Sequence, residues 1–433
     1  MDAESALLPI NLLVISKASL FQLLLIVAFW VAPVALRLMP LGLIYKPLSL
    51  DALILLFLWC AVYVLSYVAA NLLAPSFRRL PQRLLIALNN SRLTKAVILL
   101  SGIAFIGGLL LFYEYAIARS YGFSTPVSDI RILEINAVDA GRKGSFVSGL
   151  GRFMMPSLLA AWPLYIILIK NRVTRASYLL FASTILVIWV QAMYEGGRFF
   201  LVSLLGVCLF ALFSSKGFSI FKSIRNVFLP ALVTLCVALY SAYIFLTRVE
   251  DSASLANTFD IFAGTFDVAL SDSGLHILSG PLGYGAFPAY MLLLYATHPL
   301  SELVHILSAD SSFTSFGGYQ FPQFIQLFGV LGFPLSLSDV GDSLSRPGVY
   351  VTLIGANYID FSVLGVIASG IFYGYATGCA LRFYRIDPTS SCSGCARLLF
   401  LCSCFAMVHP LLTSVWPAFF WILFSRVRLK PLF

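Results

Sequence analysis

Residues 53–64 read LILLFLWCAVYV, a stretch that is apolar on every face of a helix or a strand. Nine stretches of this kind are long enough, or nearly so, to cross a bilayer as helices of about 20 residues. They are residues 18–36, 50–74, 96–118, 153–169, 176–194, 199–214, 226–247, 361–381 and 398–424. A membrane barrel would instead alternate polar and apolar residues. The sequence therefore predicts an all-α, polytopic transmembrane helix bundle with about 9–12 spans.

The composition leads to the same class of protein. Of the 433 residues, 60% are hydrophobic and only 11% are charged, with a mean hydropathy of +0.93. A soluble domain has roughly a quarter of its residues charged. The net charge of +9 would suggest a nucleic-acid partner in a soluble protein. Here most of the excess lies in short loops between spans, so we expect contact with membrane lipids and no nucleic acid.

The distribution of charge predicts the orientation in the membrane. Loops rich in Lys and Arg mark the cytoplasmic side, and they occur at residues 75–95, 170–175, 216–225 and 382–397. Because successive spans cross the membrane in opposite directions, residues 119–152, 195–198 and 248–360 are then expected outside. Residues 248–360 hold two basic and ten acidic residues, the reverse of the cytoplasmic loops.

These boundaries divide the chain into five regions. They are N-terminal transmembrane helices at 1–118, a first external loop at 119–152, central transmembrane helices at 153–247, a large external loop at 248–360 and C-terminal transmembrane helices at 361–433. Apolar stretches inside the large loop are short and interrupted by prolines, which favours interfacial or re-entrant helices. The last region is either one span at 398–424 or a hairpin broken at 409–410.

Gly370, Gly374 and Gly378 recur at every fourth residue of one predicted span. Such a stripe of small residues lets another helix approach closely. We therefore expect a helix contact along this face.

Cationic residues on the external side are the unexpected feature, because positive charge is biased away from that face. They are Arg119, Arg131, Arg142, Lys143, Arg152, Arg198 and Arg248. A guanidinium group at the end of a span lies at about the depth of the lipid phosphates, where it can bind a pair of phosphate oxygens. Arginine also snorkels to ordinary headgroups, and Glu195 or Glu250 could neutralise a neighbour. Taken as a set, these cations favour a polyanionic ligand at the outer surface.

Several catalytic motifs are missing from the chain. It has no Walker-type phosphate loop, no His-Glu-x-x-His and no Gly-x-Ser-x-Gly, which disfavours ATP-driven transport and the common membrane peptidases. Cys392 and Cys395 are followed by Cys402 and Cys404, but this spacing departs from that of a zinc site. We expect no metal and no cofactor.

Four short motifs together resemble the O-antigen polymerase (Wzy) family of bacterial oligosaccharide repeat-unit polymerases. They are Asp129-Ile130-Arg131 in the first external loop, Gly196-Gly197-Arg198 at the start of a span, Gly348-x-Tyr350, and Tyr358-Ile359-Asp360-Phe361 ahead of Gly365. The resemblance covers roughly residues 100–385.

The resemblance implies a multi-pass enzyme of the bacterial inner membrane with its active site facing the periplasm. Such an enzyme belongs to lipopolysaccharide biosynthesis and transfers a growing glycan from undecaprenyl diphosphate to a hydroxyl of the next lipid-linked repeat unit. A chain-length regulator protein is an implied partner. A diphosphate leaving group needs cations rather than a proton donor, so a metal-independent glycosyltransferase is expected.

The expected site residues follow from this chemistry. Those for the donor diphosphate are Arg131, Arg198 and Arg248, with Arg142, Lys143, Arg152, Arg346, Tyr350 and Tyr358 as further binding residues. A base for the acceptor hydroxyl is sought among Glu195, Asp360, His276, His298 and His305. The two last histidines are seven residues apart, so on a helix they could share a face, and the sequence does not choose among the five.

Two alternatives stay open at this stage. An O-antigen ligase-like glycosyltransferase would use the same phosphate-binding arginines with a different acceptor. A flippase or transporter of lipid-linked glycans would favour charges deep inside several spans, whereas the charges here cluster at span ends.

Overall fold

A computed structural model describes the greater part of the chain. The described residues are 17–73, 82–121, 145–168, 175–195, 199–216, 246, 254–309, 314–317, 319–320, 351–386, 391–409 and 412–427. Within them the fold is all-α apart from one two-stranded sheet. Four segments are long and apolar enough to cross a bilayer, namely Ser19–Leu38, Leu50–Leu72, Leu93–Ala118 and Leu353–Arg382. The chain is a multi-pass membrane protein.

Shorter apolar helices take the place of several other predicted spans. They are Ser177–Val190, Phe200–Ala211 and Gly394–Cys404. The predicted span at 153–169 is wrong as a single helix, because α5 (Phe146–Met154) ends before Pro156 and α6 (Ser157–Leu168) begins after it. Proline has no N–H with which to extend the hydrogen-bond ladder of α5. The predicted span at 226–247 falls almost wholly outside the described residues.

The glycine stripe of α15 (Leu353–Ile386) packs against α2 (Leu50–Leu73), which confirms the expected close contact. A Cβ atom at Gly378 would lie 2.8 Å from the Cβ of Ala70, and one at Gly374 would collide with the carbonyl oxygen of Tyr63. Only glycine allows backbones to approach this closely.

The contacts along these two helices show that they run parallel. The indole nitrogen of Trp59 donates to the hydroxyl of Ser369 over 3.1 Å, and Arg382 donates to the carbonyl oxygen of Asn71 over 2.9 Å. Later residues of α2 therefore meet later residues of α15. Parallel packing agrees with the alternation of sides predicted from the basic loops.

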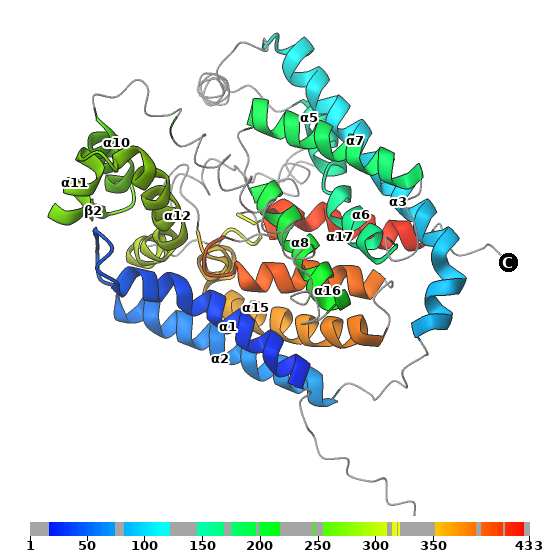
Figure 1. The fold of residues 1–433 in the computed structure, drawn as a ribbon. Coiled ribbons are helices and arrows are strands. Elements are labelled where there is room, and N and C mark those ends of the chain that lie inside the picture. Colours follow the sequence, from blue (N-terminus) through cyan, green and yellow to red (C-terminus); the bar gives the residue numbers. More distant parts are fainter. Residues whose placement is uncertain are drawn as a thin grey trace, which may run out of the picture.

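A second group of helices surrounds α3 (Figure 1). Its members are α3 (Gln82–Phe112) with the π-helix η1 (Tyr113–Ala118), α5, α6, and α7 (Arg175–Val190) with the π-helix η2 (Gln191–Glu195). Helix α8 (Phe199–Lys216) joins them through its contact with α6. Serine hydroxyls fix the packing. Ser157 of α6 donates to the carbonyl oxygen of Leu100 over 2.9 Å, and Ser183 of α7 donates to that of Ser101 over 2.8 Å.

The C-terminal region forms a hairpin of two short helices, α16 (Ser391–Cys404) and α17 (Leu412–Val427). A Cβ atom at Gly394, near the start of α16, would lie 2.8 Å from the side chain of Ile422, near the end of α17. The two helices are therefore antiparallel. Of the two alternatives left open by the sequence, the single span at 398–424 is wrong, because a turn at 405–408 interrupts it.

Residues 254–309 of the large loop predicted to be external form a compact group beside one end of α1 (Lys17–Leu38) and α2 (Figure 1). Its elements are α10 (Leu255–Gly264), β2 (Val268–Leu270), α11 (Asp272–Ser279) and α12 (Gly283–Ser308), around a small core of their own. Strand β2 pairs antiparallel with β1 (Leu43–Tyr45), so that Tyr45 faces Val268. The short α1–α2 connection and the large loop thus lie on one side, as alternation predicts.

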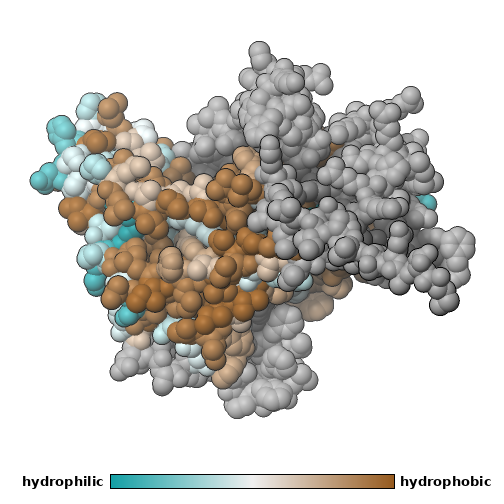
Figure 2. Space-filling view, turned by 90° about the horizontal axis from the view of Figure 1, so that it is seen from below, coloured by the Kyte–Doolittle hydropathy of each residue, from teal (hydrophilic) through white to brown (hydrophobic). Residues whose placement is uncertain are grey.

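Outward-facing apolar side chains cover the surface formed by α1, α2 and α15. Figure 2 shows a broad hydrophobic face with hydrophilic residues gathered towards one edge. Large side chains exposed on α1, α2 and α15 include Leu24, Phe57, Leu65 and Phe372. A soluble monomer does not expose so large an apolar patch, whereas helices in contact with lipid do.

Candidate functional site

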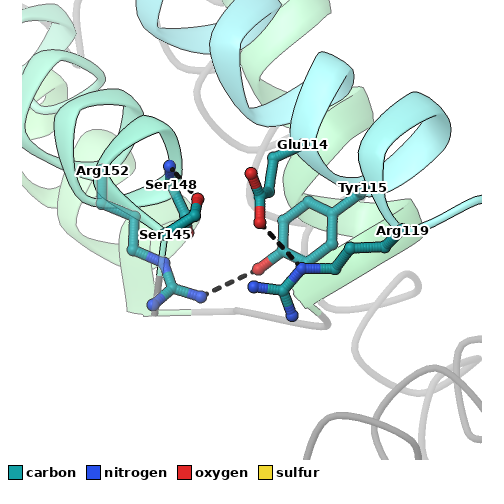
Figure 3. A network of polar contacts seen from close by, with 6 residues as sticks. All are labelled: Glu114, Tyr115, Arg119, Ser145, Ser148 and Arg152. Carbon is teal, nitrogen blue, oxygen red and sulfur yellow. Dashed lines mark hydrogen bonds and ion pairs between the residues drawn. The ribbon is translucent and has the colours of Figure 1, made fainter. Parts of the chain in front are cut away.

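The ends of α3, α5 and α7 meet at one tyrosine. The ring of Tyr115 stacks on the ring of Tyr194, with centroids 5.3 Å apart and planes inclined by 8°. The guanidinium carbon of Arg119 lies 5.4 Å from the Tyr115 centroid. Arg152 donates a hydrogen bond to the Tyr115 hydroxyl over 2.8 Å. Together with Glu114, these residues form what we call the arginine–tyrosine cluster, and Figure 3 shows its members other than Tyr194.

The π-helix η1 brings Glu114 and Arg119 of this cluster together. The Arg119 amide donates to the Glu114 carbonyl oxygen over 3.0 Å, a bond between residues i and i+5. Residues five apart therefore lie above one another, which they do not in an α-helix. As a result, Nε of Arg119 lies 2.9 Å from Oε1 of Glu114, and both side chains are less than a tenth exposed. Short π-helices of this kind occur frequently at functional sites.

Two glycines place Arg152 beside Tyr115. A Cβ atom at Gly107 of α3 would lie 3.0 Å from the carbonyl oxygen of Gly151 of α5, so this approach requires the absence of side chains. Helix α5 starts at Ser145, whose hydroxyl accepts the Ser148 amide over 3.0 Å as an N-cap. The next residue after Gly151 then reaches across to α3.

The cluster holds one enclosed ion pair and one guanidinium at the surface. The charge of Arg119 is balanced locally by Glu114, as the sequence had suggested for other external arginines. Arg152 is exposed and donates a hydrogen bond to the Tyr115 hydroxyl. Figure 3 shows both guanidinium groups pointing towards that hydroxyl from two different helices.

Asp360, a candidate base in the sequence, is fully enclosed in another part of the molecule. Its carboxylate accepts the Tyr319 amide at 2.9 Å, the amide and side chain of Gln320 at 3.3 and 3.0 Å, and the Ser315 hydroxyl. It sits where α15 breaks, since Ser362 has φ of 57°. A carboxylate held by four donors fixes Ser315, Tyr319 and Gln320 and is poorly placed to take a proton from a substrate.

The two histidines of α12 lie seven residues apart on one helix and have different surroundings. His298 is buried, its Nδ1 lies 3.0 Å from the carbonyl oxygen of Leu294, and its ring centroid lies 4.3 Å from that of Phe266. This is a packing position. His305 is exposed and lines a hollow of about 50 Å³ with Lys46 and other residues.

Polar side chains surround Tyr45 in the group formed by β1, β2, α10, α11 and α12. Thr297 donates to the Tyr45 hydroxyl over 3.0 Å, and the guanidinium carbon of Arg37 lies 4.8 Å from the tyrosine ring centroid. Burial raises the pKa of Tyr45 above its ordinary value. Its hydroxyl therefore stays protonated at neutral pH and serves the packing of β1 on α12.

The remaining residues expected from the sequence are placed as follows. His276 is exposed on α11, and Tyr358 is half-buried near Ile306 and Val351. Glu195 ends η2, directly after Tyr194. Those that lie outside the described residues are Arg131, Arg142, Lys143, Arg198, Arg248, Arg346 and Tyr350. The structure thus brings Arg152 and the backbone of Glu195 to one end of the α3 group and does not bring Asp360 or the histidines there.

Metal ligands are not grouped in the part of the chain that the structure describes. No three His, Cys, Asp or Glu side chains among those residues are arranged to hold a metal ion. Cys402 and Cys404 are buried in α16, where they pack as small apolar side chains.

Sequence reasoning missed Glu114, Tyr115 and Tyr194. Arg119 was recognised as an external cation, but its pairing with Glu114 depends on a π-helix, which no sequence pattern indicates. The available signal was an acidic residue inside a run of aromatic residues at the end of a predicted span.

Comparison with known proteins finds no family model, no curated protein and no solved structure that matches this chain. The functional argument therefore depends on the residues and their geometry.

Proposed function

We propose that this protein is a membrane glycosyltransferase that polymerises oligosaccharide repeat units linked to undecaprenyl diphosphate, acting on the outward face of the bacterial inner membrane. The observation that carries this proposal is the arrangement of Arg119 and Arg152 around Tyr115 at one end of the α3 group. The motif resemblance to O-antigen polymerases supports the same reading.

The orientation of the cluster is the first step. Positive charge just before α3 and in its first half predicts a cytoplasmic start for this helix. Its far end, with Glu114 and Arg119, then faces outward, as does the short helix α5, whose last turn carries Arg152. Lys and Arg are not needed on that side for topology, so a ligand is the better explanation of two guanidinium groups that converge there.

The chemistry of the donor explains why arginines are suited to this position. Transfer of the glycan breaks the bond between the sugar C1 and an oxygen of the lipid diphosphate, and negative charge accumulates on the diphosphate. Guanidinium groups in a partly enclosed site stabilise such charge strongly and need no reorganisation during the reaction. Their paired N–H groups match phosphate oxygens.

Chain connectivity adds Arg198 to the same region. It follows Tyr194 of the cluster by four residues, and four residues span at most about 14 Å. We propose that Arg198 completes the donor site, with Arg131 and Arg248 contributed by the two external loops. The proposal also includes a full bundle of about 9–12 spans, with interfacial helices of the large loop above the site.

Chain extension by the purified protein tests the proposed function. Protein in detergent micelles would be given a synthetic undecaprenyl-diphosphate-linked repeat unit, and the products would be separated by size. We expect a ladder of lipid-linked polymers, formed without sealed vesicles. Transfer only to a lipid A core acceptor would identify a ligase instead, and no transfer in the absence of sealed vesicles would favour a transporter.

A further inference from the structure

We infer that the first half of α12 and the turn before it are inserted into the membrane surface, where phospholipids cover their exposed face. This face is formed by Leu282, Tyr284, Gly285, Ala289 and Leu292, and we call it the α12 apolar face. The inference goes beyond the proposed function, because it assigns a lipid partner to particular side chains and would hold for another activity of the same fold.

A long uncharged stretch is the first observation. No Asp, Glu, Lys or Arg occurs between Asp272 and Glu302, although the predicted external loop that contains this stretch has ten acidic residues. The first half of α12 is therefore without charge on every face. A helix whose exposed side is in water carries polar residues there, whereas a helix that is apolar all round is buried in protein or in a membrane.

Protein covers only one side of this half of α12. On that side four residues are buried in the core that α12 shares with α10, β1 and β2, and they are Phe287, Tyr290, Met291 and Leu294. On the other side Leu282 is 74% exposed, Tyr284 71% and Leu292 48%. A Cβ atom at Gly285 would have no neighbour within 4 Å. The part of the chain that the structure describes thus leaves the α12 apolar face uncovered.

Two contacts hold this surface near the end of a membrane span. Ser301 of α12 accepts a hydrogen bond from Arg37, in the last turn of α1, over 2.7 Å. Gly274 of α11 approaches Gly42, which follows α1, so closely that a Cβ atom at Gly274 would collide with the Gly42 carbonyl oxygen. Figure 1 shows α11 and α12 beside this end of α1. Because α11 has eight residues and is only about 12 Å long, the α12 apolar face lies within reach of the bilayer surface.

The exposed apolar surface continues from the span itself. Leu38, at the end of α1, is 82% exposed, and Leu41 in the connection that follows is also exposed. The outer group carries its exposed charges on other elements, such as Asp260 on α10 and Asp272 at the start of α11. Separate apolar and charged surfaces are typical of structures that lie in the membrane interface, where tyrosines such as Tyr284 are enriched. Continuity with the lipid-facing surface of α1 favours lipid, rather than a second protein, as the partner.

Quenching of a fluorescent amino acid tests the inference. The probe, whose emission depends on polarity, would replace Leu282 in the full-length protein in phosphatidylcholine nanodiscs. The matched control carries the same probe at Asn257, an exposed position of α10. We expect the emission at 282 to be shifted to the blue and quenched by phosphatidylcholine with a nitroxide on its acyl chain. The probe at 257 should instead be quenched by iodide in the water.

Equal iodide quenching at the two positions would overturn the inference, because the α12 apolar face would then be in water. Protection of the probe at 282 from both quenchers would also overturn it, since protein, such as a second copy of the chain, would cover the face. Leu292 is the second labelling position if the protein labelled at 282 does not elute as a folded species in size-exclusion chromatography. The test needs no polymer formation, so its failure leaves the proposed function intact, and failure of the chain-extension assay leaves this inference intact.

Discussion

Two helix ends in this molecule hold buried carboxylates, and they differ in what surrounds the charge. At the end of α3, Glu114 is paired with Arg119, and Arg152 beside them reaches the surface. At the break in α15, Asp360 is enclosed by amide and hydroxyl donors from its own protein. The first arrangement leaves cations where a ligand can meet them, and the second uses all of its hydrogen bonds to hold a loop. Residue type alone therefore does not distinguish a binding site from a structural contact.

The largest expected effect comes from removing the exposed cation of the first region. R152A should lower kcat of chain extension by about 10²–10³-fold, which corresponds to about 2.7–4 kcal/mol, because one charged donor to the diphosphate is lost. R152K should recover only part of the rate, since lysine lacks the planar fork. The measurement is the initial rate of polymer formation by purified variants.

Lys46 provides the matched control for this prediction. It is an exposed cation in the outward connection between α1 and α2, outside the arginine–tyrosine cluster. K46A should retain the wild-type rate. Equal losses in R152A and K46A would mean that general surface charge matters and that the cluster is not a specific site.

Substitutions in the second region, at Asp360, should lower the stability of the protein. D360A removes the acceptor for buried donors of Tyr319 and Gln320, so we expect a loss of about 2–3 kcal/mol in the free energy of unfolding. D360N keeps one oxygen acceptor and should lose less. Unfolding in detergent, followed by circular dichroism, measures both. A D360N protein of normal stability but without polymerase activity would contradict the structural role given to Asp360.

The packing of α15 on α2 holds the helix that carries Asp360, and disturbing it should cost less stability than the loss of Asp360. In G374A the new methyl group would meet the carbonyl oxygen of Tyr63, so the helices must separate, at a cost of about 1–2 kcal/mol. Gly285 of α12 has open space at its Cβ position, and G285A should not destabilise the protein. The same unfolding measurement compares the two variants, and equal stabilities would refute the close contact.

The two histidines of α12 give the smallest expected difference. H298A leaves a gap against Phe266 and should destabilise the protein by about 1 kcal/mol, whereas H305A, at an exposed position, should change stability by less than about 0.5 kcal/mol. Thermal unfolding of the two variants in detergent checks this order. The reverse order would show that His305, not His298, is the packed residue.

Much of the fold follows from the sequence because apolar runs and glycine spacing have direct physical consequences. The long helices α1, α2, α3 and α15 and the glycine contact were predicted in this way. The break between α5 and α6 was not predicted, and the C-terminal hairpin was only one of two alternatives, because a run of hydrophobic residues does not show where its backbone ladder is interrupted. The pairing of β1 with β2 joins residues more than 200 positions apart and leaves no local pattern.

The arginine–tyrosine cluster was predicted less completely than the fold, because its partners are brought together by π-helices. Sequence indicated external arginines, and Arg152 and Arg119 both lie beside Tyr115 at one end of the α3 group. The partners Glu114, Tyr115 and Tyr194 come from two π-helices, whose widened turns change which residues share a face. Asp360 and His298 were candidates because of their chemistry, and only burial shows how their polar atoms are used.

The most direct test of the account is a cryo-electron microscopy map of the protein in a lipid nanodisc with bound undecaprenyl diphosphate. The account predicts phosphate oxygens within about 3.2 Å of nitrogens of Arg152 and Arg119, at the outward ends of α3 and α5. Density for the diphosphate at another place in the molecule, or an Arg152 side chain directed towards acyl chains, would contradict it.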